Sequence, residues 1–280
     1  MKLKSLRLLV MAALVAGTVS SAFAADSKVI PFSDPVNGQL SGAAAYPAEH
    51  ASTSSIYNPV LDFYNGGYDK SVVLIKHFKT YQQTSEISCG PATALMVLNH
   101  YGVTAGENQL AKEMDIRGPE NRRVDGSYGA SMAGMAKVFR DRGFTVQTAH
   151  DTADEDGYSF ADINAFKDFV LKNLKEGNPV MVENIEWGGH WFAIIGYDDM
   201  GTATPIDDTL IVADPYDTSD QHQDGYYVMN AYRFFSEWFD NSVLPANERI
   251  QPYVVVTKTP SRVTVTGDFQ VAVQSKVTMK

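Results

Sequence analysis

Residues 83–92 have the sequence QTSEISCGPA and lead directly into an apolar helical pattern over residues 93–101. Cys89, the only cysteine in the 280-residue chain, lies at this boundary. The start of a helix lowers the pKa of a thiol, because unpaired backbone N–H groups and the helix macrodipole favour negative charge there. Since the thiolate is the reactive form of cysteine, this position indicates a nucleophile. The alternative interpretation is a buried, inert cysteine that packs as a small apolar side chain.

The first 24 residues are typical of a secretory signal peptide. They contain a basic start over residues 1–7, a short apolar run over residues 8–19 and a small-x-small cleavage site at residues 22–24. We therefore expect a mature protein that begins at Ala25 and is exported, either to a periplasm or out of the cell. The apolar run is shorter than the roughly 20 residues needed to cross a bilayer. No membrane attachment is expected after cleavage.

Export makes the single cysteine more informative. Exported proteins commonly use cysteine in disulfide pairs, and one cysteine cannot form an internal disulfide. Composition adds a second constraint: a net charge of −10 argues against binding nucleic acid or anionic lipid through a broad basic surface. Hydrophobic residues make up 44% and charged residues 20% of the chain, as in an ordinary globular protein.

The chain divides into three parts after the signal peptide. Residues 25–67 are rich in Ser, Ala, Gly, Pro and Asn, and predict a loose N-terminal extension, which could be a linker or an inhibitory prosegment. Residues 68–258 alternate helix and strand signals and are expected to form one domain. Residues 259–280 form a C-terminal tail.

Within the domain, four helices are expected, at residues 91–102, 108–114, 131–142 and 163–175. Gly102 suits the left-handed conformation that follows a helix, and Asp162 suits an N-cap. Strands are expected at residues 179–184, 190–197, 209–213 and 253–256. Helices followed by antiparallel strands indicate an α+β fold.

His190 and Asp214 are expected to face each other. His190 begins one strand and Asp214 follows the next, so antiparallel pairing would place them side by side. A cysteine nucleophile needs a base, and the base needs a partner that fixes its tautomer. The sequence therefore predicts a triad of Cys89, His190 and Asp214, with Asp217 as the nearest substitute for Asp214. Purely structural roles, at a strand end for His190 and at the turn before Pro215 for Asp214, remain open.

Acyl transfer also needs a donor for the oxyanion that develops during the reaction. Gln83 could supply a side-chain N–H, together with the backbone N–H of Cys89, and Gln82 is its competitor. Trp191 follows His190 and could touch substrate, although core packing is the more common use of tryptophan.

Three segments together resemble the bacteriocin double-glycine leader peptidases, peptidase family C thirty-nine, in a secreted stand-alone form. They are residues 83–92, residues 189–198 with the sequence GHWFAIIGYD, and residues 213–215 with the sequence ADP. The resemblance covers roughly residues 77–239 and keeps the order Gln, Cys, His, Asp. It implies a papain-like cysteine peptidase fold, in which a central helix packs on an antiparallel sheet.

The resemblance also implies a role for each site residue. Cys89 matches the nucleophile, His190 the general base and acid, Asp214 the orienting acid and Gln83 the oxyanion donor. A peptide or protein would be the substrate, hydrolysed or transferred through an acyl-enzyme, with no cofactor and no metal.

Two alternatives remain. The segment that begins at Cys89 is also similar to phytochelatin synthases, members of the same superfamily, which suggests a γ-glutamyl peptidase or transferase acting on glutathione. The other is a catalytically inactive module that holds peptides. We expect no attached transporter and no cysteine-rich tail that would gather metal.

Other polar residues are expected to be structural. The acidic run of residues 151–157 resembles part of a calcium loop, but Thr152 and Ile163 occupy its first and twelfth positions, so a solvated turn is expected. The remaining histidines are assigned to the structure or the surface: His50, His77, His100, His150 and His222.

Overall fold

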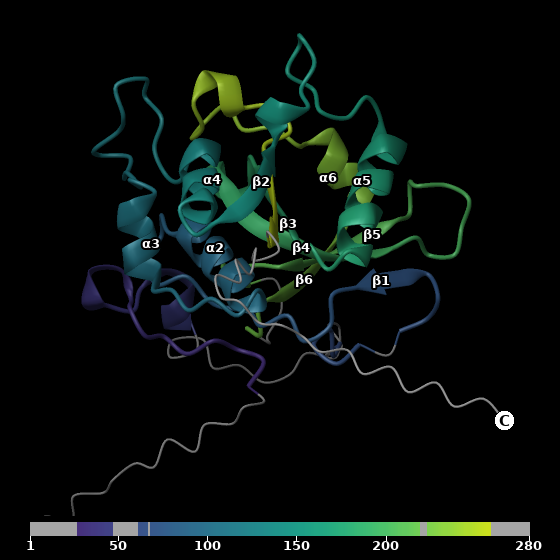
Figure 1. Ribbon diagram of the computed structural model, residues 1–280, viewed down its shortest axis with the longest axis horizontal. Coiled ribbons are helices and arrows are strands. Elements are labelled where there is room, and N and C mark those ends of the chain that lie inside the picture. Colours follow the sequence, from purple (N-terminus) through teal and green to yellow (C-terminus); the bar gives the residue numbers. More distant parts are fainter. Residues whose placement is uncertain (1–26, 47–60, 67, 219–222, 259–280) are drawn as a thin grey trace, which may run out of the picture.

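The computed structural model describes residues 27–46, 61–66, 68–218 and 223–258 (Figure 1). The expected signal peptide at residues 1–24 and the C-terminal tail at residues 259–280 lie outside the described residues. His50 and His222 also lie outside them.

One antiparallel sheet forms the centre of the molecule. Its main path runs β2-β7-β3-β4-β5-β6, and β1 pairs with the far half of β4. The strands are β1 (Val72–Leu74), β2 (Phe144–Thr148), β3 (Val180–Asn184), β4 (His190–Asp198), β5 (Thr209–Ala213), β6 (Tyr226–Asn230) and β7 (Tyr253–Lys258). All four predicted strands are present, and β1, β2 and β6 are additional. The first eight residues of β4 are buried, so this strand is the axis of the core.

Helices cover both faces of the sheet (Figure 1). They are α2 (Cys89–His100), α3 (Glu107–Glu113), α4 (Met132–Arg140), α5 (Ile163–Lys175) and α6 (Ala231–Ser236). Successive side chains of a strand point to opposite faces. Trp191 of β4 faces α2, since a Cβ added at Gly90 of that helix would lie 3.5 Å from Trp191 Cδ1. Phe192 faces α6, because its ring lies 5.8 Å from that of Phe234. The predicted α+β class, with a central helix on an antiparallel sheet, is confirmed.

The residues of α2 explain its central position. Residues 89–98 are all buried, because the helix is apolar on every side and packs between β4 and the other helices. Its end follows the prediction: Gly102 adopts a φ of +75°, and the N–H of Val103 donates to Leu98 O at 2.9 Å. This burial fixes the position of Cys89, the first residue of the helix.

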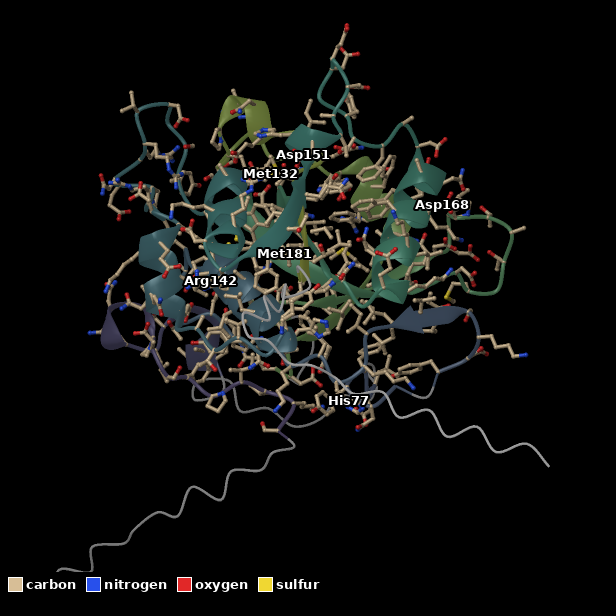
Figure 2. The ribbon with its side chains drawn as sticks, in the orientation of Figure 1. His77, Met132, Arg142, Asp151, Asp168 and Met181 are labelled. Atoms are coloured by element: carbon tan, nitrogen blue, oxygen red, sulfur yellow. The ribbon has the colours of Figure 1, made fainter. Side chains whose placement is uncertain are left out.

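Side-chain caps define the starts of two other helices. Ser131 Oγ accepts from Gly134 N at the start of α4, and Asp162 Oδ1 accepts from the second and third residues of α5. The core between helices and sheet includes Met132 of α4 and Met181 of β3, both at most 1% exposed (Figure 2).

The described part of the N-terminal segment packs on the domain. Ser41 N donates to Thr84 O at 3.0 Å, and Ala44 N donates to Gln83 O at 3.0 Å. Composition predicts a loose extension, but residues 27–46 instead lie against the segment that leads to Cys89. Small residues allow this close approach. In the sequence they give no periodic apolar pattern, so the packing could not be predicted.

Candidate active site

Cys89 is the first residue of α2, and Ser88 occupies the N-cap position. The thiol is free, and the residue is 8% exposed. A short turn holds the approach to the helix, because Ser85 N donates to Ser88 Oγ at 3.2 Å. The thiol is therefore presented at a helix N-terminus by a fixed backbone, with a small accessible surface.

His190 and Asp214 are brought together by the pairing of β4 with β5. The two strands are antiparallel, with Ala193 opposite Ala213, so the start of β4 lies beside the residue after β5. His190 Nε2 donates to Asp214 Oδ1 at 2.7 Å, and the same oxygen accepts from Tyr216 N at 2.7 Å. The carboxylate is thus held in place from two directions.

The other ring neighbour of His190 is Cys89, whose side chain forms a hydrogen bond with the imidazole. Because Nε2 is bonded to Asp214, Nδ1 is the nitrogen that faces the thiol. Burial favours the neutral ring, but the Asp214 carboxylate and the Cys89 thiol group outweigh it and raise the pKa of His190 to about 10. The arrangement therefore favours an imidazolium at neutral pH.

The alternative partner, Asp217, lies elsewhere in the network. Its Oδ2 accepts from Gly225 N at 3.0 Å. The carboxylate in hydrogen-bond contact with His190 is that of Asp214.

The two glutamines before Cys89 have different surroundings. Gln82 bridges the backbone after β5, donating to Asp214 O at 2.9 Å and accepting from Asp217 N at 3.1 Å. Gln83 donates one N–H to Ser85 O at 2.7 Å, which leaves the second N–H of its amide for another acceptor. Each amide keeps one N–H, but the Gln82 amide is bonded to backbone through both its nitrogen and its oxygen, whereas within the described residues Gln83 is bonded only through its nitrogen.

Trp191 lies beneath the site, in the core. It is 1% exposed, and its indole N–H donates to Ala130 O at 2.9 Å. The expected contact with substrate is corrected here, because the side chain has almost no accessible surface. Its position next to His190 in the sequence is misleading, since adjacent residues of a strand point to opposite faces.

Glu107, at the start of α3, organises the segment before Cys89 and was not among the predicted site residues. It is fully buried and accepts hydrogen bonds from four donors: Thr84 N (3.0 Å), Thr84 Oγ1 (2.6 Å), Ser88 Oγ (2.6 Å) and Tyr81 OH (2.9 Å). Burial raises the pKa of Glu107, while these donors favour its charged form. In the sequence it is an ordinary acidic residue in the first turn of a short helix, so no pattern indicates this role.

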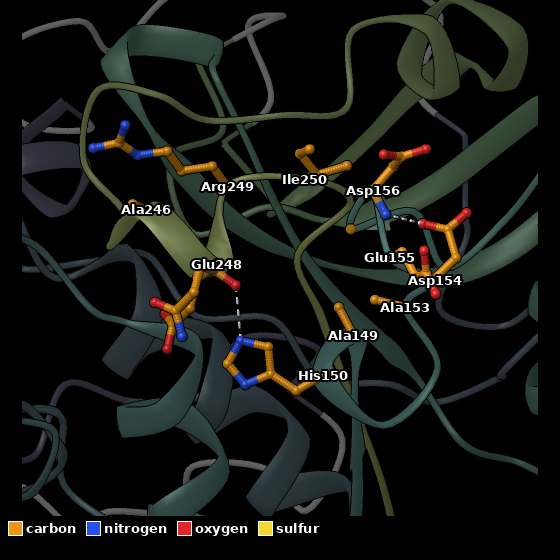
Figure 3. Close-up of a pocket in the computed structure, with 12 residues that line it drawn as sticks. Ala149, His150, Ala153, Asp154, Glu155, Asp156, Ala246, Glu248, Arg249 and Ile250 are labelled. Atoms are coloured by element: carbon orange, nitrogen blue, oxygen red, sulfur yellow. Dashed lines mark hydrogen bonds between the residues drawn. The ribbon is translucent and has the colours of Figure 1, made fainter.

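The other described histidines have structural contacts. His100 Nε2 lies 2.8 Å from Gly177 O, His77 contacts the ring of Tyr64, and His150 Nε2 lies 2.9 Å from Asn247 O (Figure 3). His150 lines a surface cavity of about 480 Å³ together with the acidic turn, whose Asp154 Oδ1 accepts from two backbone N–H groups of the turn itself.

The described ranges contain neither a metal-binding cluster nor a membrane-spanning helix. Within these ranges no group of three or more His, Cys, Asp or Glu side chains is placed to hold a metal ion. Across the same part of the chain, none of the helices is long and apolar enough to cross a membrane.

Comparison with known proteins adds a family. The model of the Peptidase_C39 like family matches residues 75–239, more than half of the chain. The search of curated proteins gives no match. The peptidase domain of Streptococcus ComA, described as a bifunctional ABC transporter involved in quorum sensing, is 17% identical, with a TM-score of 0.38; the alignment covers 65% of this chain and 100% of that domain. A Bacillus anthracis protein described as a C39-like peptidase is 15% identical, with a TM-score of 0.45 and coverage of 67% and 98%.

Proposed function

Since the chain belongs to the Peptidase_C39 like family, we propose that it is a cysteine peptidase whose triad is Cys89, His190 and Asp214. The observation that carries the proposal is the His190 ring, which contacts the thiol group of Cys89 on one side and the carboxylate of Asp214 on the other. This is the order of contacts that a base between a nucleophile and an orienting acid requires.

The chemistry follows from these contacts. The Cys89 thiolate attacks the peptide carbonyl carbon and forms a C–S bond, while the carbonyl oxygen takes negative charge. The imidazolium of His190 then protonates the leaving nitrogen as the C–N bond breaks, which leaves a thioester. Neutral His190 next takes a proton from water, the hydroxide attacks the thioester, and the C–S bond breaks to release a carboxylate and regenerate Cys89.

Two donors are proposed for the oxyanion, the backbone N–H of Cys89 and the second amide N–H of Gln83. Preorganised donors of this kind typically contribute about 10²–10³ in rate. The support for Gln83 is that its amide lies beside the turn that precedes Cys89 and is bonded to backbone only through its nitrogen within the described residues, whereas both polar atoms of the Gln82 amide are bonded to backbone.

The test combines thiol reactivity with hydrolysis. The wild-type thiol is expected to react with iodoacetamide well below the free-cysteine pKa of about 8.5, and His190→Ala should remove that advantage. A mixture of quenched fluorescent peptides should be cleaved by the wild type and not by Cys89→Ala. A thiol whose reactivity is indifferent to His190→Ala would overturn the triad.

The same assays decide between the alternatives. Cleavage of glutathione in place of peptides would indicate the γ-glutamyl peptidase. None of the matches named above is a phytochelatin synthase. A reactive thiol with tight peptide binding but no cleavage would indicate a binding module.

We also propose that residues 1–24 direct export to a periplasm or the medium. N-terminal sequencing of protein recovered from those fractions should give Ala25 as the first residue. An uncleaved chain retained inside the cell would contradict the proposal.

A further inference from the structure

A buried glutamate that the mechanism above does not use lies next to the start of α2. Glu183 of β3 is 1% exposed and lies opposite Trp191 of β4. Directly opposed strand residues point to the same face, and Trp191 faces α2, where a Cβ added at Gly90 would lie 3.5 Å from Trp191 Cδ1. Glu183 therefore points toward the helix that begins with Cys89, and the two groups interact electrostatically.

No described donor satisfies the Glu183 carboxyl group. Neither of its oxygens has a hydrogen-bond donor within the described residues, and the group within hydrogen-bond reach is the carboxyl group of Asp240. Asp240 is fully buried, and its Oδ2 also lacks a donor among those residues. Two buried carboxylates cannot bond to each other without a proton, so one of them is a carboxylic acid.

The backbone decides which group holds the charge. Asp240 Oδ1 accepts from Ser242 N at 2.5 Å and from Val243 N at 3.0 Å, and both bonds stabilise a carboxylate. Glu183 has no such donors. The other titratable groups that act on it are Cys89 from α2 and Glu248 from the 3₁₀ helix Ala246–Glu248, and each of them, like Asp240, disfavours charge on Glu183.

We propose that Glu183 is a positioning residue. It is protonated next to Cys89, and its O–H donates a hydrogen bond to the Asp240 carboxylate, so that the negative charge of the pair stays on Asp240. The inference rests on the proposed function, in which Cys89 reacts as a thiolate. A second negative charge beside it would oppose formation of the thiolate. Burial and the Asp240 carboxylate both raise the pKa of Glu183 well above its ordinary value, in agreement with this assignment.

Asp240 of this pair also lies against Gly189, the residue before His190. A Cβ added at Gly189 would lie 2.5 Å from Asp240 Oδ2 and 2.4 Å from Val243 Cγ2, and Gly189 adopts a φ of +115°. Only glycine allows this approach without strain. The hydrogen bond from Glu183 thus holds Asp240 against the backbone that begins β4.

The experiment compares two near-isosteric variants, one that leaves the negative charge on Asp240 and one that moves it to Glu183. Glu183→Gln keeps a donor toward Asp240 and adds no charge. Asp240→Asn offers an amide N–H to Glu183, which then becomes the carboxylate of the pair, beside Cys89. The readout is the rate of iodoacetamide alkylation of Cys89 from pH 5 to pH 10, which needs no knowledge of the substrate.

We expect Glu183→Gln to stay within about threefold of the wild type across this range. Asp240→Asn should react about tenfold more slowly near pH 7, with its profile moved to higher pH by about one unit, since one unit of pKa is a tenfold change in the thiolate ratio. Equal losses in the two variants, or an unchanged Asp240→Asn, would overturn the inference. Circular dichroism of both variants checks that they fold.

A second measurement does not depend on the folding of Asp240→Asn. The infrared spectrum of the wild type at neutral pH should contain a protonated carboxyl band that is lost in Glu183→Gln, and its absence would contradict the proposal. If His190→Ala leaves alkylation unchanged, the proposed triad fails, while the comparison of Glu183→Gln with Asp240→Asn still reports the charge beside Cys89.

Discussion

Glu107 and Glu183 are two buried glutamates near the start of α2, and their surroundings are opposite. Glu107 accepts hydrogen bonds from hydroxyl and backbone groups of the segment that leads to Cys89. Glu183 has no donor within the described residues and faces another carboxyl group. Burial alone therefore does not decide the charge of a carboxyl group; the donors around it do. One glutamate fixes the backbone as an acceptor, and the other acts as a donor.

The largest expected effect on stability comes from removing the N-terminal residues that bond to Thr84, a partner of Glu107. Val36 N donates to Thr84 Oγ1 at 2.8 Å, and Ser41 N donates to Thr84 O. A chain that begins at residue 47 should lose more than about 3 kcal/mol of unfolding free energy relative to one that begins at Ala25, because buried apolar groups and several hydrogen bonds are lost. Urea denaturation measures this difference.

The rates of Cys89 alkylation and peptide cleavage are a second measurement on the same truncated chain. The loss of support for Gln83 should lower the rates of alkylation and peptide cleavage. An inhibitory prosegment predicts the reverse, a gain in both rates on truncation, so the sign of the change separates the two hypotheses.

The second-largest effect is expected from replacing Glu107 itself. Glu107→Gln would turn an amide NH₂ toward groups that are themselves donors, and we expect a loss of about 2–3 kcal/mol in unfolding free energy and slower alkylation of Cys89. The control is Glu113→Gln on the same helix, where the partly exposed ion pair with Arg142 should contribute less than about 1 kcal/mol. Equal effects of the two variants would show that the Glu107 network does not position the site.

These two glutamates also mark the limit of what the sequence predicts. The helix starts at Ser131 and Asp162, the end of α2 at Gly102 and the buried strand β4 follow from local rules, namely capping, glycine conformation and apolar runs. Those elements were predicted to within about two residues. The meeting of His190 with Asp214 was predicted because antiparallel neighbours bring the end of one strand beside the start of the next.

The missed features depend on contacts between distant residues. β2 and β6 are the outer strands of the main sheet, and each has exposed or half-buried residues among its five, so their sequences lack the long apolar run that marked β4. Glu183 lies inside a predicted strand, but its partner Asp240 is 57 positions further along the chain (240 − 183). No local pattern reveals that the two acidic side chains share one buried site.

A smaller effect on stability is expected from neutralising Asp214. Asp214→Asn keeps an acceptor for His190 but removes the charge, so the pKa of His190 should fall from about 10. A histidine whose folded pKa is raised contributes stability that is fully present below its unfolded value near 6.5 and is lost as pH rises through about 10. The variant should therefore be about 2 kcal/mol less stable at pH 6, and the difference should shrink toward pH 10.

Two measurements check this prediction. Urea denaturation at several pH values follows the stability difference, and NMR titration of the His190 ring follows its protonation. A stability difference that is independent of pH would show that Asp214 acts only as a hydrogen-bond acceptor.

The smallest effect is expected at Glu183, because glutamine reproduces the shape and the donor of a protonated glutamate. Glu183→Gln should change the unfolding free energy by less than about 1 kcal/mol at pH 5, in contrast to Glu107→Gln. The folded pKa of Glu183 is raised, so its contribution is present below the unfolded pKa of about 4.3 and is lost as pH rises toward the folded value. Glutamine cannot ionise, and Glu183→Gln should therefore become the more stable protein as pH rises. If the variant instead lost as much stability as Glu107→Gln at every pH, Glu183 would be an acceptor like Glu107, and the contrast between the two glutamates would be wrong.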